Sequence, residues 1–155
     1  MSKGDQPPKV PKMPTTGWTI RLAEPAEAVY RELNQKAMEA EERNDATSAH
    51  CKTLRMVDEM LDRLIPQNPI DHKNALAGNL SNIFRYKKGR MRIYWIASSV
   101  RREVVVLFIS DTPRKEGDAH DPYEMFSRMV MSGKYNEIFK KLGVRLPPGT
   151  AYETH

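Results

Sequence analysis

The sequence has 155 residues but only one cysteine, Cys51. An internal disulfide needs two thiols and a thiolate zinc site needs several, so both are excluded, and a reducing compartment is favoured. The longest aliphatic and aromatic run, 104–109, is far shorter than the ~20 residues of a membrane-spanning helix. The first residues, MSKGDQPPKVPKMP, lack the apolar stretch of a secretory signal. We therefore expect a cytoplasmic protein that does not enter a membrane.

Signals of well-known enzyme classes are also scarce. The four histidines stand at scattered positions, with no pair at metal-ligand spacing: His50, His72, His120 and His155. We therefore expect no metal and no cofactor. The Gly-Lys pair at 133–134 lacks the rest of a phosphate-binding loop, which argues against a nucleotide-binding fold. Asp111, Asp118 and Asp121 gather near a predicted loop, where helix capping and exposure to solvent explain them more simply than acid–base chemistry.

The length fits one domain, since domains have roughly 100–200 residues. Residues 1–16 contain four prolines, three lysines and one large aliphatic side chain, Val10. Such a segment buries too little apolar surface to order itself, so we expect a flexible tail. We expect the folded domain over 17–146 and a loose C-terminal tail over 147–155.

Periodicity predicts an α+β fold in which an antiparallel meander sheet packs on a helical hairpin. Period-2 alternation predicts strands, and apolar residues three or four apart predict amphipathic helices. Asp121-Pro122 with Glu124 is typical of a helix start. The expected elements are a strand at 18–22, helices at 25–44 and from 47 or 48 to Pro66, strands at 83–87, 90–97 and 103–109, and helices from 121 to about 132 and at 135–142.

Positive charge is concentrated in the predicted meander. From 85 to 102 the chain has seven basic residues and no acidic one: Arg85, Lys87, Lys88, Arg90, Arg92, Arg101 and Arg102. Strand alternation places Arg85 and Lys87 on one face, next to Arg90 and Arg92 of the following strand. Like charges on neighbouring strands repel, so the pattern favours an anionic partner such as phosphate. The alternative is a solvated face whose Lys and Arg stems cover apolar surface.

The strands expected at 90–97 and 103–109 differ in their apolar patterns, which indicates that the two strands are covered differently. The strand 104–109 is apolar on both faces and should be central and covered on two sides. In the strand before it, Met91, Ile93 and Trp95 alternate with Arg90, Arg92 and Tyr94. On the charged face Tyr94 is placed to stack on a base.

The order of elements and the segment 83–94, IFRYKKGRMRIY, resemble the RelE/ParE superfamily of bacterial toxins. The likeness lies in two basic residues separated by one, then Gly-x-x-Arg, then an aliphatic and aromatic run. The strand 104–109 with Arg114 after it is also similar. The segment from Ile109 to Ser132-Gly133 is similar more particularly to the YhaV-like toxins.

This resemblance implies the toxin of a type II toxin–antitoxin system, an endoribonuclease that cuts mRNA without a metal, on the ribosome or without it. It implies a cognate antitoxin, and promoter DNA bound only by the toxin–antitoxin complex. Matched by position, the catalytic residues are Arg85, Lys87, Arg92, Arg114 and Tyr123. The implied RNA-binding residues are Lys88, Arg90, Tyr94 and Lys115.

The chemistry of such a site follows from its substrate. RNA carries its own nucleophile, the 2′-hydroxyl, so the protein must position it, remove its proton and stabilise charge on the transition state. Lys87 is the better base candidate because neighbouring arginines favour its neutral form, whereas arginine does not give up its proton. Arg92 and Arg114 would clamp the phosphate, while Tyr94 or Tyr123 would stack a base or hold the leaving oxygen. Tyr123 fits the apolar side of a capped helix equally well.

Two other functions remain open at this point. A ParE-type toxin is similar in sequence but poisons DNA gyrase without cutting nucleic acid. A small basic RNA-binding protein without activity would show salt-dependent binding and no cut ends.

Overall fold

The computed structural model describes residues 17–45, 47–112 and 121–151. Its sheet contains β1 (Thr19–Leu22), β2 (Phe84–Lys88), β3 (Met91–Ser98) and β4 (Glu103–Ser110), in the order β1-β4-β3-β2. β2, β3 and β4 form an antiparallel meander, while β1 pairs in parallel with β4. The expected α+β class and meander are confirmed.

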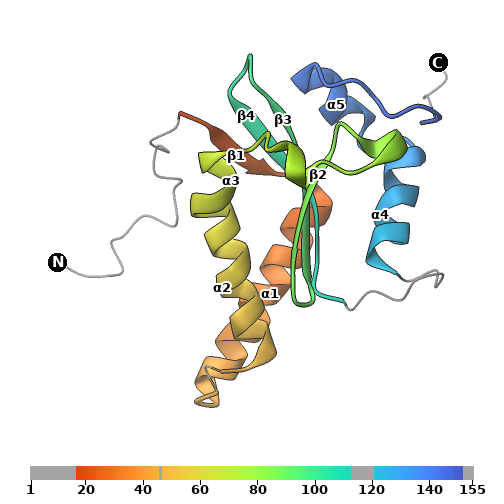
Figure 1. The fold of residues 1–155 in the computed structure, drawn as a ribbon. Coiled ribbons are helices and arrows are strands. Elements are labelled where there is room, and N and C mark those ends of the chain that lie inside the picture. Colours follow the sequence, from red (N-terminus) through yellow and green to blue (C-terminus); the bar gives the residue numbers. More distant parts are fainter. Residues whose placement is uncertain (1–16, 46, 113–120, 152–155) are drawn as a thin grey trace.

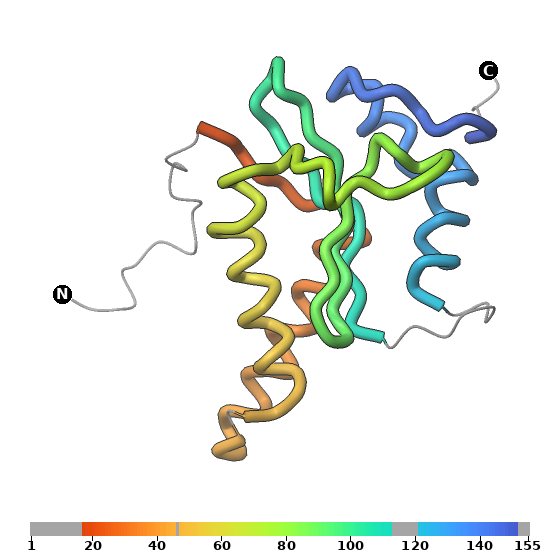
Figure 2. Tube along the Cα trace, in the orientation of Figure 1, coloured from red at the N-terminus to blue at the C-terminus, as the bar shows by residue number. Residues whose placement is uncertain are grey.

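A helical hairpin covers one face of the sheet. α1 (Glu24–Glu42) is followed by α2 (Ala49–Glu59), which continues through the π-helical turn η2 (Met60–Leu64) into α3 (Ile65–Gln67). Pro25 lies in the first turn of α1, and the Ser48 side chain caps α2 by accepting a hydrogen bond from the Cys51 N–H. Figure 2 shows the far end of the hairpin projecting past the end of the strands. The expected hairpin is therefore confirmed.

Two shorter helices cover the opposite face of the sheet (Figure 1). α4 (Pro122–Met131) begins at Asp121, whose buried side chain accepts a hydrogen bond from the Glu124 N–H. α5 (Asn136–Leu142) ends at Gly143, which takes the left-handed conformation typical of glycine after a helix. The predicted cap and both helices are confirmed. Two 3-10 turns, η3 (His72–Asn74) and η4 (Gly78–Leu80), lead into β2.

Part of the segment expected as a loose C-terminal tail is docked. The Ala151 N–H donates to the Met131 carbonyl at 2.9 Å, and Asn136 Nδ2 donates to the Ala151 carbonyl at 2.8 Å. Thr150 is buried as well. These contacts hold the segment at the end of α4 and the start of α5, and the Met131 carbonyl, which lies in the last turn of α4, gains a hydrogen-bond partner. The tail expected over 1–16 lies outside the described residues.

The sheet separates two apolar cores, as the two-sided β4 pattern predicted. Trp95, Ile93 and Val106 pack towards the helical hairpin, whereas Tyr94 and Leu107 pack towards α4 and α5. A β-bulge places Leu107 as an extra residue of β4 between the pairs Tyr94–Phe108 and Trp95–Val106. The carbonyl of Leu107 accepts a hydrogen bond from the Tyr135 hydroxyl at 2.9 Å. No helix among the described residues is long and apolar enough to cross a membrane.

Candidate functional site

Three predicted cations share the sheet face that α4 covers, which we call the α4 face. In the β2–β3 register Arg85 pairs with Tyr94, and Lys87 pairs with Arg92. Directly paired residues of antiparallel strands project to the same side. Lys87 is exposed, Arg85 is half-buried and Arg92 is only 9% exposed. The three cations therefore form a short basic stretch, deep at Arg92 and open at Lys87.

These three cations differ from the other basic residues in their surroundings. Within 17–45, 47–112 and 121–151, none of them has a carboxylate at ion-pair distance. Many other Lys and Arg side chains do, in the pairs Arg21–Glu103, Arg101–Glu103, Arg63–Glu59, Lys36–Glu32, Lys140–Glu137 and Arg90–Asp111. A buried cation without a carboxylate is costly to fold, so its presence favours an external anion.

The β2–β3 turn positions Arg92. Its Nη1 donates to the Gly89 carbonyl at 3.0 Å. Gly89 has a φ of +59°, which glycine adopts without the steric cost that a Cβ would bring. The tight turn therefore places the Gly89 carbonyl where it holds the guanidinium of Arg92, the residue that pairs with Lys87.

Tyr94 corrects one of our predictions. Its ring is fully buried and stacks on Phe126 of α4, with 4.1 Å between ring centroids, so the prediction that it stacks on a base is wrong. Burial raises the pKa of the Tyr94 hydroxyl, and the charges of Arg85 and Arg92 partly oppose that rise. The sequence could not show this, because it did not reveal that α4 packs on the charged face.

Arg90 and Lys88 do not lie on the α4 face with the other three cations. Arg90 stands in the turn, where its Nε donates to the Asp111 carbonyl at 3.1 Å. Lys88 pairs with Met91, so it projects to the hairpin side, opposite Lys87. The predicted cluster of four cations therefore has three members, Arg85, Lys87 and Arg92. RNA-binding roles for Lys88 and Arg90 stay predictions.

The remaining candidates come from the segment after β4. Arg114 and Lys115 lie outside the described residues. Tyr123 is half-buried in the first turn of α4 and packs with the apolar core on the α4 face. The structure therefore supports its packing role, and a catalytic role stays a prediction.

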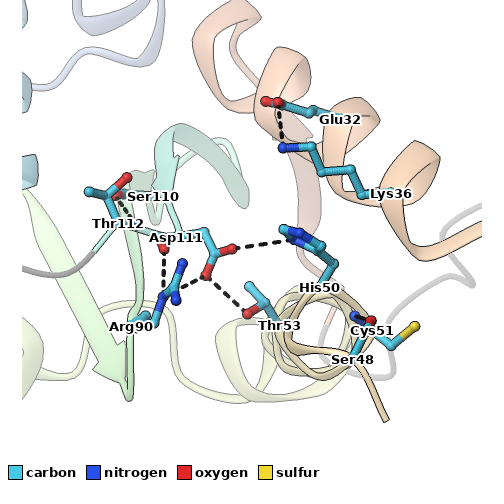
Figure 3. Close-up of polar contacts among 10 residues, drawn as sticks. All are labelled: Glu32, Lys36, Ser48, His50, Cys51, Thr53, Arg90, Ser110, Asp111 and Thr112. Atoms are coloured by element: carbon cyan, nitrogen blue, oxygen red, sulfur yellow. Dashed lines mark hydrogen bonds and ion pairs between the residues drawn. The ribbon is translucent and has the colours of Figure 1, made fainter. Parts of the chain in front are cut away.

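Sequence reasoning missed a polar cluster around Asp111, at the end of β4. Thr53 Oγ1 donates to Asp111 Oδ1 at 3.0 Å, Arg90 Nε lies 3.8 Å from that oxygen, and His50 Nδ1 lies 3.9 Å from Asp111 Oδ2 (Figure 3). We expected Asp111 to be a solvent-exposed loop residue, but the structure gives it three polar neighbours as well. The partners His50 and Thr53 are about sixty positions away in the sequence, and only the packing of the helical hairpin on the sheet brings them together.

The sequence also matches the model of a known protein family. A sequence model of the YhaV toxin family, described as toxins with endonuclease activity from toxin–antitoxin systems, matches residues 21–145. The chain belongs to this family. The match spans the helical hairpin, the whole meander and both C-terminal helices. Because the family is described by its endonuclease activity, the match argues against the two alternatives without nuclease activity, the gyrase inhibitor and the inactive RNA-binding protein.

Solved structures similar to this YhaV-family toxin are distant in sequence. The RelBE2 toxin–antitoxin complex of Mycobacterium tuberculosis matches at 17% identity, over 59% of this chain and 87% of that chain, with a TM-score of 0.43. The isolated RelE toxin of E. coli matches at 16% identity, over 73% and 95% of the two chains, with a TM-score of 0.40. The comparison with curated proteins gives no match.

Proposed function

We propose that this YhaV-family toxin is a metal-independent endoribonuclease that cleaves mRNA in the cytoplasm. The observation that carries the proposal is the gathering of Arg85, Lys87 and Arg92 on the α4 face, with no carboxylate at ion-pair distance in the described part of the chain. A phosphodiester supplies the missing negative charge. RNA supplies the nucleophile too, through its 2′-hydroxyl.

Each cation then has a role that fits its place. Lys87 is exposed, so its amine reaches a bound 2′-hydroxyl and takes its proton. Arg92 is held by the Gly89 carbonyl and stabilises the extra negative charge of the transition state. Because the guanidinium is fixed before substrate arrives, little reorganisation is needed during the reaction. Arg85 binds a neighbouring phosphate, and Arg114 is the candidate for a second clamp.

The packing beneath the cations supports this arrangement. Tyr94 pairs directly with Arg85, lies two residues from Arg92 on β3, and is stacked on Phe126. A rigid aromatic layer keeps the basic side chains from collapsing into the sheet. In this proposal Tyr94 is a positioning residue that does not touch RNA.

The partners follow from the family and from the charge. The cognate antitoxin belongs to the system, and we propose that an acidic or extended segment of it covers the basic α4 face or the helical hairpin. Promoter DNA is proposed as a ligand of the toxin–antitoxin complex only. The ribosome is proposed as the setting in which mRNA is presented.

The test is cleavage of a defined mRNA by the purified toxin, with and without translating ribosomes, in the presence of EDTA. Attack by the 2′-hydroxyl leaves a 2′,3′-cyclic phosphate or 3′-phosphate on one fragment and a 5′-hydroxyl on the other. We expect these ends, and we expect EDTA to leave the rate unchanged. Cut ends that appear only with ribosomes would make the ribosome part of the active complex.

Two results would overturn the proposal. Fragments ending in 3′-hydroxyl and 5′-phosphate would exclude the 2′-hydroxyl as nucleophile. Equal loss of cleavage in Lys87→Met and in the control Lys134→Met would mean that charge at the α4 face has no special role. Lys134 is an exposed lysine in the segment that joins α4 to α5. In Figure 1 these two helices meet away from the β2–β3 turn.

A further inference from the structure

A pocket lies between the helical hairpin, the end of β4 and the start of α4. Its volume is about 290 Å³. Apolar side chains from three elements line it: Val29 and Leu33 of α1, Phe108 and Ile109 of β4, and Pro122 and Met125 of α4. Known ligand pockets begin at about 300 Å³, so this one has room for a group the size of one nucleobase.

The rim of the pocket carries polar groups from separate elements. Asp111 Oδ1 is occupied by Thr53 and faces Arg90, whereas Oδ2 faces His50 Nδ1 at 3.9 Å, too far for a hydrogen bond. His50 Nδ1 is buried and has no hydrogen-bond partner among the described residues. A buried polar atom without a partner is uncommon in native proteins and requires an explanation. A ligand that hydrogen-bonds with the imidazole would supply one, and Asp111 Oδ2 can accept a hydrogen bond from the same ligand.

The pocket adjoins the basic α4 face. Ser110, which lines it, pairs directly with Arg92 across β3 and β4. Arg90 and Lys36 stand at its edge, with side chains about half exposed. A polynucleotide that placed one phosphate at Arg92 would therefore have a neighbouring base within reach of the pocket, and the next phosphate would meet Arg90 or Lys36.

We propose that this pocket is a nucleobase subsite, which receives one base of the RNA next to the scissile phosphate and sets the sequence preference of cleavage. The inference rests on the proposed function. The apolar walls contact the faces of the ring, and the Asp111 carboxylate and the His50 imidazole read its polar edge. This division of contacts is common in ligand sites, where apolar surface supplies affinity and a few polar groups supply specificity.

Binding is tested first, without any cleavage. AMP, GMP, CMP and UMP are titrated separately into the full-length toxin, and the imidazole signals of His50 and the methyl signal of Met125 are followed by NMR. We expect at least one nucleotide to shift both signals saturably, while ribose 5-phosphate, which has no base, leaves them unchanged. The exposed His72 of η3 is the internal control. No shift with any nucleotide, or equal shifts with ribose 5-phosphate, would overturn the subsite.

Specificity is tested second, with His50→Ala and the control His72→Ala. Within the part of the chain that the structure describes, His50 makes no hydrogen bond through Nδ1, so its replacement should leave the fold intact, which the urea midpoint checks. We expect His50→Ala to weaken nucleotide binding about tenfold and to change the ratio of kcat/KM between RNAs that differ in one base beside the cut by a similar factor. An unchanged ratio in a folded variant would refute the subsite. Absence of RNA cleavage by the unsubstituted toxin would instead refute the proposed function, while the nucleotide titration still decides the subsite.

Discussion

Arg92→Met separates the charge of Arg92 from its packing. Methionine keeps a long apolar stem in the space that Arg92 fills at 9% exposure, but it removes the guanidinium. The loss of one preorganised transition-state contact costs about 10²–10³ in rate. We therefore expect kcat to fall by that factor in single-turnover cleavage of a labelled RNA.

Stability should change far less than activity in this variant. Arg92 donates to the carbonyl of Gly89, an exposed residue, so water can replace the lost hydrogen bond. Removal of a buried cation with no carboxylate nearby among the described residues is favourable and offsets part of that loss. We expect the free energy of unfolding, measured in urea, to change by no more than about 1 kcal/mol.

Arg92→Lys completes the set. Lysine keeps the positive charge but lacks the planar guanidinium and its paired N–H donors, so we expect kcat to fall by roughly tenfold, less than in Arg92→Met. If Arg92→Met cleaves RNA within threefold of the unsubstituted toxin while remaining folded, Arg92 does not act on the transition state. If it unfolds, the residue is structural and the reasoning about its charge is refuted.

Three further predictions concern the packing that supports the site. Phe126→Ala removes the ring that stacks on Tyr94 and should cost about 3–5 kcal/mol in urea unfolding; a loss under 1 kcal/mol would contradict the packing of α4. Asp121→Ala removes a buried helix cap and should cost about 1–2 kcal/mol, again by urea unfolding; an unchanged midpoint would count against the cap. The pKa of Tyr94 is raised above its usual 10.0 by burial, so its contribution to stability is complete below pH 10 and is lost as pH rises further. Tyr94→Phe should therefore lose less stability than the unsubstituted toxin above pH 10, and parallel pH profiles would refute this.

The elements of the fold could be predicted because each is encoded locally. Asp121-Pro122 with Glu124 specifies a capped helix start, and Lys88-Gly89 specifies a tight turn between two alternating strands. The apolar run 104–109 indicates a strand covered on both faces, which β4 is. These signals depend on neighbours in sequence, so tertiary packing did not have to be known.

The candidate site could be predicted only in part. Strand alternation is a local property, and it predicted that Arg85 and Lys87 lie on the same face as Arg92. The β2–β3 register confirms this. The burial of Tyr94 depends on Phe126, and the cluster at Asp111 depends on His50 and Thr53, which are distant in sequence. Periodicity shows which residues share a face, but it does not show which element covers that face.

Lys87 and Lys88 offer the most direct test of the central claim, because these adjacent, exposed lysines project to opposite faces of β2. The measurement is RNA cleavage by Lys87→Met and Lys88→Met at equal concentrations, with urea unfolding as the check on folding. At saturating RNA, where a weaker affinity does not limit the rate, we expect Lys87→Met to lose at least about a hundredfold in the rate of the cleavage step and Lys88→Met, whose predicted role is RNA binding, to stay within about threefold. Equal effects of the two substitutions, or a larger effect of Lys88→Met, would contradict the assignment of cleavage to the α4 face.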